Sequence, residues 1–194
     1  MNLRHSFQDK YAEFDGSPFL EEEFVWGRIE YREEAPKERV PIRYNVYTDK
    51  IEFYFNGQIM ELLAYPLVER VFLESRIFVF GSHRDGRNVS TGFYQLLVEG
   101  NSSLLQKYQT KLFDPVPSKP MQDAKPARFV SQPSSFFIET PEGELLLFNK
   151  VKELPGYFPR HRKTLLNYIK SEKISSRNTE ELIRFFNFLN SLEP

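Results

Sequence analysis

The 194-residue chain has no cysteine, a single tryptophan and only three histidines. The absence of cysteine excludes disulfides, thiol nucleophiles and cysteine metal ligands, but it does not identify a cellular compartment. No apolar run approaches the roughly 18 residues that a membrane-spanning helix needs. The 26 basic and 27 acidic residues give a net charge of −1, so no overall field would attract nucleic acid or an anionic membrane.

Aromatic residues are abundant instead, with 19 phenylalanines and 10 tyrosines. The 40% hydrophobic and 27% charged residues are typical of a globular protein. The first ten residues, MNLRHSFQDK, lack the apolar region of a signal peptide. A leader removed from a longer precursor remains an alternative.

Alternating apolar and polar residues predict an antiparallel β-meander. A strand is expected in EEFVWGRIEYRE, with Gly27 as a bulge or kink. In PIRYNVYTDKIEFYFNG, residues 41–57, two alternating runs form a hairpin. Asn56-Gly57 predicts a tight turn, because both residues tolerate positive φ, and hence a third strand at 58–63.

The meander is expected to continue with two strands in 69–80, a polar loop over 81–88 and a hairpin from 91 to 113. Its second arm, 103–113, also suits a helix, but a strand is favoured because the arm follows a tight turn. Four prolines in 114–127 predict an extended crossing segment. Short strands are expected in ARFVS and SFFIET, and residues 141–143 form a turn into ELLLF.

Helical periodicity appears only near the C-terminus, over 161–171 and 179–192. The first helix places Leu165, Leu166 and Ile169 on one side, and Asn178 is the predicted N-cap of the second. The predicted fold is therefore α+β: a twisted, rolled or barrel-like antiparallel meander with two C-terminal helices packed on it. It comprises an N-terminal arm (1–20), a β-rich domain (21–157) and the helical pair (158–194) packed on the same domain.

The aromatic hairpin holds the candidate ligand-binding residues: Arg43, Tyr44, Asn45 and Asp49. Aromatic residues on paired strands stabilise a sheet through cross-strand contacts. A structural role is therefore favoured over a ligand site, and Tyr44 is expected in the core.

Motifs for catalysis are weak. His83-Arg84-Asp85 copies a kinase tripeptide without its other motifs, and Asp85-Gly86 is better explained as a hairpin turn. His5, His83 and His161 lack metal-ligand spacing, and each is expected to be solvated. Carboxylates at Asp49 and Glu52, or at 21–23, would act only across a cleft, which a sequence cannot reveal. No metal, nucleotide or other cofactor is predicted.

The C-terminal segment is basic, with charged side chains at His161, Arg162, Lys163, Lys170, Lys173 and Arg177. Nucleic-acid binding would need exposed aromatic rings among them. The nearby Tyr168, Phe185 and Phe186 are expected to be buried by the helices, so no nucleic-acid partner is predicted.

Four phrases resemble, in the same order, a family of uncharacterised, typically exported small proteins of Bacteroidetes-type bacteria. They are GSPFLEEEFVWGRI, PIRYNVYTDKIEF, QDAKPARFV and KTLLNYIKSEKISSRNTEELIRFFNFLNSL, and the resemblance runs over nearly the whole chain. EEAPKERV departs from the glycine turn that is typical of that family at this place. The resemblance implies an exported, periplasmic or envelope location and no established activity; a cytoplasmic location is the alternative.

These observations predict a non-enzymatic binding or interaction module of the cell envelope, with another envelope protein as partner. The alternative is a carrier that holds a small apolar ligand inside the rolled sheet. A hydrolase with paired carboxylates in a cleft ranks third. A sheet interior filled by aromatic rings would favour the first hypothesis, and a hollow interior the second.

Overall fold

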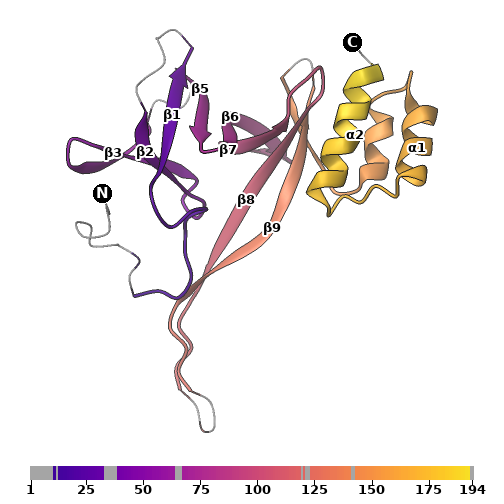
Figure 1. Ribbon diagram of the computed structural model, residues 1–194. Helices are drawn as coiled ribbons and strands as arrows, with labels where there is room; N and C mark the ends of the chain where they lie inside the picture. The colour runs from indigo at the N-terminus through magenta and orange to yellow at the C-terminus, as the bar shows by residue number, and fades with distance from the viewer. Residues whose placement is uncertain are drawn as a thin grey trace. The chain divides into compact units, whose positions relative to one another are not determined.

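The computed structural model describes residues 11, 13–32, 39–63, 67–118, 120, 123–140 and 143–192. These residues form ten strands, the 3₁₀ helix η3 (Val151–Gly156) and the C-terminal helices α1 (Arg162–Ser171) and α2 (Thr179–Leu192) (Figure 1). The predicted α+β class is confirmed. The chain divides into two compact units, one of residues 1–76 and 108–133 and the other of residues 77–107 and 134–194. The boundaries cut through the predicted domain 21–157.

Unit 1 contains five consecutive short strands. They are β1 (Val25–Tyr31), β2 (Val40–Asn45), β3 (Lys50–Phe55), β4 (Gln58–Glu61) and β5 (Val68–Leu73). Their spatial order is β4-β3-β2-β1-β5, with antiparallel neighbours. Asn56 and Gly57 have φ values of 49° and 84°, which confirms the predicted tight turn and the third strand after it.

Gly27 does not form the predicted bulge. A Cβ atom there would lie 2.3 Å from the carbonyl oxygen of Phe72 on β5. Gly27 therefore permits close approach of two backbones. The irregularity in the pairing of β1 with β5 falls between Glu30 and Tyr31 instead.

The described part of the predicted N-terminal arm joins this sheet. Phe19 forms an antiparallel bridge with Asn45, and Asp15 forms a parallel one with Arg128. The Val46 amide donates to the carbonyl of Pro18 at 2.8 Å. Residues 15–20 thus belong to unit 1, whereas 1–10 and 12 lie outside the described residues.

The proline-rich segment is a hairpin arm and not the predicted crossing. It joins β8 (Ser103–Phe113) to β9 (Arg128–Glu139), which lie side by side in Figure 1. Val116 and Lys125 exchange two backbone hydrogen bonds of 2.9 Å, so the chain turns back on itself. Proline cannot donate to a ladder, which explains why regular strand pairing does not continue along the arm.

Unit 2 is built on a ring of five strands. They are β6 (Arg76–Asp85), β7 (Asn88–Val98), β8, β9 and β10 (Leu145–Phe148). Only residues 103–107 of β8 and 134–139 of β9 belong to unit 2. Each strand is hydrogen-bonded to the next one along the chain, in the order β6-β7-β8-β9-β10. The pairs β6–β7, β7–β8 and β9–β10 are antiparallel. A parallel bridge between Leu145 of β10 and His83 of β6 closes the ring.

The predictions for these strands have different outcomes. Residues 103–113 are a strand, as favoured. The polar loop over 81–88 is wrong: β6 continues to Asp85, and only Gly86 and Arg87 separate it from β7. Gly86 has a φ of 60°, so the turn beside Asp85 is tight. The two strands expected in 128–139 are one strand, and residues 141–142 lie outside the described residues.

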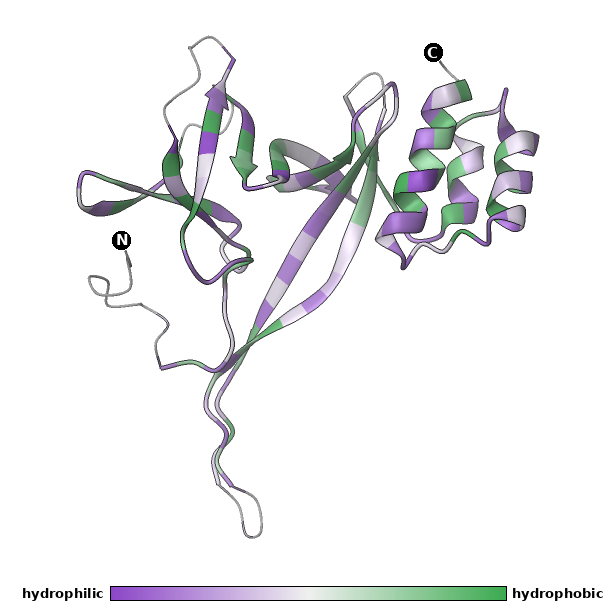
Figure 2. Cartoon of the chain, viewed as in Figure 1, coloured by the Kyte–Doolittle hydropathy of each residue, from purple (hydrophilic) through white to green (hydrophobic). Residues whose placement is uncertain are grey.

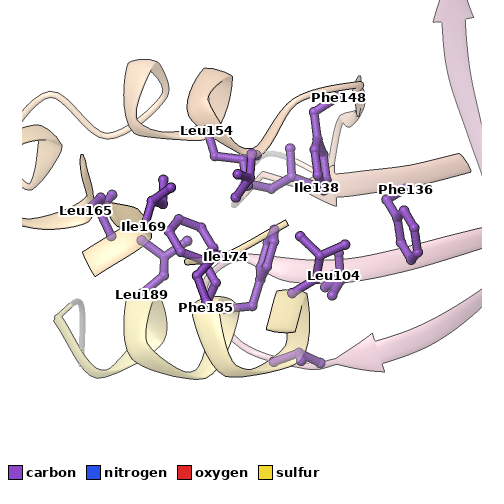
Figure 3. Close-up of a cluster of buried hydrophobic side chains, with 14 of the residues drawn as sticks. Leu104, Phe136, Ile138, Phe148, Leu154, Leu165, Ile169, Ile174, Phe185 and Leu189 are labelled. Atoms are coloured by element: carbon purple, nitrogen blue, oxygen red, sulfur yellow. The ribbon is translucent and has the colours of Figure 1, made fainter. Parts of the chain in front are cut away.

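The alternation of side chains gives the ring two cores. All five strands contribute to an interior cluster of Tyr94, Leu105, Phe137 and Leu145, against which Val79 and Leu96 pack. Adjacent residues such as Leu104, Phe136 and Ile138 point the other way, into a cluster shared with η3, α1 and α2. Figure 3 shows these strand residues and the helix residues pointing toward one another.

Both C-terminal helices are amphipathic, and Figure 2 shows apolar and polar patches along each of them. Leu165 and Ile169 are buried as predicted, but Leu166 is 40% exposed, which corrects the predicted stripe. The buried stripe of α1 is thus narrower than predicted, and η3, which was not predicted, packs against it. Tyr168 of α1 stacks on Phe188 of α2, with ring centroids 4.0 Å apart.

Local hydrogen bonds fix the position of α2. The Asn178 side-chain oxygen accepts from the amides of Glu180 and Glu181 at 3.0 and 3.2 Å, which confirms the N-cap. Near the other end, the Asn190 side chain accepts from the Ser102 amide at 3.0 Å and donates to the Ser102 carbonyl at 3.1 Å. The helix is thereby tied to the turn between β7 and β8.

Candidate functional site

The four residues singled out from the sequence lie in one hydrogen-bonded group of unit 1. Arg43 Nε donates to Glu52 at 2.8 Å, and the Tyr44 hydroxyl donates to Asp49 at 2.6 Å. The Asn45 side chain donates to Glu52 at 3.4 Å and accepts from the Thr48 amide at 3.0 Å. These bonds connect residues of β2 with residues of β3 and of the turn between the two strands.

The same group is enclosed by aromatic rings. The Arg43 guanidinium lies 3.7 Å from the ring centroid of Phe19 and 4.5 Å from that of Phe24, within cation–π range. Tyr44 is fully buried. Polar groups that are buried and hydrogen-bonded to one another hold a fold together, so the arrangement fits a scaffold better than a ligand site.

The carboxylates do not converge on a reaction centre. Asp49 and Glu52 are bonded to Tyr44 and Arg43, while Glu21 accepts from Arg76 at 2.5 Å. Across the described ranges, no group of three acidic or histidine side chains is placed to hold a metal ion. The geometry therefore supplies no support for a hydrolase with paired carboxylates.

His83 is partly buried instead of solvated, which corrects the expectation for this residue. Its Nδ1 lies 2.6 Å from the Tyr94 hydroxyl, and its ring centroid lies 4.6 Å from that of Phe137. Partial burial, and secondarily the Lys107 ammonium, lower the pKa of His83 below its usual value, against the opposing charge of Asp85. The His83 side chain thus contacts neighbouring strands at the seam of the ring, and its lowered pKa favours the neutral form.

An open apolar recess lies elsewhere in unit 1, on strands β1 to β4. The strand register sets Trp26 beside Pro41 and Phe53 beside Met60. The recess has a volume of about 610 Å³, and it is lined by Trp26, Ile29, Tyr31, Arg39, Val40, Pro41, Phe53, Phe55 and Met60. Arg39 is the one charged residue among these nine.

Several lining side chains are exposed although they are large and apolar. Trp26 is 60% exposed, Phe55 50% and Met60 44%. A single exposed apolar residue is ordinary, but a group of them around one concavity is typical of an interaction site. The volume also falls within the range of small-molecule sites, roughly 300 to 1,000 Å³.

A second, smaller recess adjoins the first and shares Trp26 and Arg39 with it. Its volume is about 320 Å³, and its other lining residues are Gly27, Arg28, Phe72 and Glu74. The Arg28 guanidinium lies 4.4 Å from the Phe72 ring centroid and pairs with Glu30 at 2.7 Å. We call the two the apolar recess and the polar recess.

Neither recess was predicted from the sequence. Alternation marks Phe53, Phe55 and Trp26 as strand residues, but it does not distinguish a buried face from an exposed one. The one available signal was the single tryptophan beside the close-packed Gly27, and that signal is weak.

The aromatic residues near the basic C-terminal segment are packed inward. Phe185 and Phe186 are fully buried, and Tyr168 is stacked on Phe188. Stacking of nucleic-acid bases needs exposed rings, which these residues do not offer.

No family model, curated protein or solved structure matches the chain significantly. Among the described helices, none combines the length and the apolar character required to cross a bilayer. The candidate site therefore stands on its geometry.

Proposed function

We propose that the protein is a non-enzymatic binding module and that the apolar recess of unit 1 is its recognition surface. One observation carries the proposal: Trp26, Phe55 and Met60 remain largely exposed around a concavity with a single charged lining residue. Covering such side chains removes apolar surface from water, which favours binding by about 25 cal/mol per Å² before the costs of association.

The interior of the ring in unit 2 favours the hypothesis of a binding surface and disfavours that of an internal carrier cavity. Tyr94, Leu105, Phe137 and Leu145 are all buried there, so side chains occupy the position in which a carried ligand would lie. The alternative of a small apolar ligand is retained, with the recess of unit 1 as its place. A location in the bacterial cell envelope, and an envelope partner, rest on the sequence resemblance to exported proteins.

Trp26 makes the proposal directly testable, because the only tryptophan of the chain lines the recess. The uncharged apolar dye N-phenyl-1-naphthylamine is titrated into the protein while Trp26 emission and dye emission are followed. We expect saturable binding with a change in Trp26 emission. Replacing Phe55 and Met60 together by serine should weaken it at least tenfold.

The matched control is Val89→Ser, which alters an exposed apolar residue of unit 2. This variant should bind like the parent. Dye binding that survives the double substitution would place the site elsewhere, and absence of saturable binding to the parent would reject the proposed function.

A further inference from the structure

The two adjoining recesses differ in chemistry, and this difference specifies a class of ligand. Eight of the nine residues that line the apolar recess are uncharged. The polar recess is lined by two arginines and one glutamate among six residues. Trp26 and Arg39 line both, so a ligand that fills the two would pass alongside the indole ring.

The arginines favour an anion in the polar recess. Arg39 is exposed, and its guanidinium makes no ion pair with another described residue. Arg28 is held in place by Phe72 and Glu30, and its side chain is 43% exposed, although its Nε atom is buried. Planar guanidinium groups match carboxylate and phosphate oxygens in geometry as well as charge. Glu74 is the single lining acid that opposes them.

We infer that the ligand of this site is a single-chain amphiphile with an anionic head group. Its apolar chain lies against Phe53, Phe55 and Met60, and its carboxylate or phosphate lies between Arg28 and Arg39. The inference rests on the proposed function, because it assigns a ligand class to the same recess. Both recesses lie within unit 1 and require no residue of unit 2.

The test compares ligands with alkyl chains of similar length and heads of opposite charge. Decanoate and decyltrimethylammonium are titrated at pH 8, both as monomers below their micelle concentrations, with Trp26 emission as the readout. We expect decanoate to bind at least tenfold more tightly, because its carboxylate can accept charge-assisted hydrogen bonds from the arginines, whereas the ammonium head is repelled by them. Lengthening the carboxylate from eight to ten carbons should tighten binding by about fourfold for each buried methylene.

A variant that removes a charge tests the contribution of the anionic head group to binding separately from that of the apolar chain. Arg39→Gln should remove most of the preference for decanoate over decyltrimethylammonium. Arg39→Lys keeps the charge but not the planar guanidinium, and it should retain an intermediate preference. Val89→Ser again serves as the unaffected control.

The outcomes distinguish this inference from the proposed function. Equal affinity for the two amphiphiles, or a preference that persists in Arg39→Gln, would overturn the anionic ligand while dye binding still upheld the recess. No dependence on chain length would overturn the placement of the chain. Failure of the dye and both amphiphiles to bind would reject the ligand class and the proposed function together.

Discussion

Replacing Phe186 tests whether the helices are integral to unit 2. The Phe186 side chain is fully buried, with its ring centroid 6.2 Å from that of Phe148 on β10 and 5.7 Å from that of Phe185. Phe186→Ala leaves a cavity between helix and ring, and such changes cost about 3 to 5 kcal/mol. A domain is stabilised by roughly 5 to 15 kcal/mol in total, so the loss should be large.

The loss should appear as a lower melting temperature. For a chain of this size, 1 kcal/mol shifts the midpoint by roughly 2 to 4 °C, so we expect the midpoint to fall by roughly 6 to 20 °C. Far-ultraviolet circular dichroism follows the helices, both of which belong to unit 2. Trp26 emission, recorded in parallel, reports on unit 1.

The control is Leu166→Ala, on the exposed side of α1. This side chain is 40% exposed, and surface substitutions usually change stability by less than about 0.5 kcal/mol. Equal midpoints for Phe186→Ala and the parent would refute the burial of α2 against the ring. A Leu166→Ala loss as large as that of Phe186→Ala would show that the two faces of the helical pair had been misassigned.

Three further predictions concern polar contacts. Tyr44→Ala should destabilise the protein by about 3 to 5 kcal/mol in denaturant titrations. Tyr44→Phe, which keeps the ring and removes the hydroxyl that donates to Asp49, should cost about 1.5 to 3 kcal/mol. Equal costs would contradict a packing role for the ring. Asn190→Ala should cost about 1 to 3 kcal/mol, because it leaves the Ser102 backbone without its partners, and an unchanged midpoint would argue against this tie. The pKa of His83 is lowered by burial and by Lys107, and Asp85 acts in the opposite direction. Folding therefore favours neutral His83, and its contribution is complete above the ordinary pKa of 6.5 and lost as the pH falls through the lower folded-state pKa. Melting temperatures of the parent should consequently fall more between pH 7 and pH 5 than those of His83→Phe, and parallel profiles would disprove this linkage.

Much of the architecture follows from local sequence signals. The Asn56-Gly57 turn, the strand after it and the Asn178 cap each depend on residues adjacent in the chain, and each was predicted. The hairpin return of 114–127 was missed because prolines mark an extended chain but do not give its direction. His83 was misplaced because its partners, Tyr94 and Phe137, come from other strands.

The candidate site was harder to predict than the fold. Its residues come from β1, β3, β4, the start of β2 and Arg39 just before it, and the feature that marks the site is the exposure of Trp26, Phe55 and Met60. Exposure depends on which face of the sheet other parts of the chain cover, and alternation alone does not contain that information. The residues chosen from the sequence, Arg43 and Tyr44 among them, were conspicuous because they pack together.

The bridge between Leu145 and His83 has a consequence for the order of folding. An up-and-down meander reverses direction at every step, so a ring of five strands must close on two strands that run the same way. Such a seam cannot be joined by a tight turn, and its two residues lie far apart in the sequence. The hairpins of the ring close shorter loops than the seam, even where the proline-rich arm joins β8 to β9, and the long-range closure of the seam costs more entropy. The seam should therefore be the last part of the ring to form and the first through which it opens.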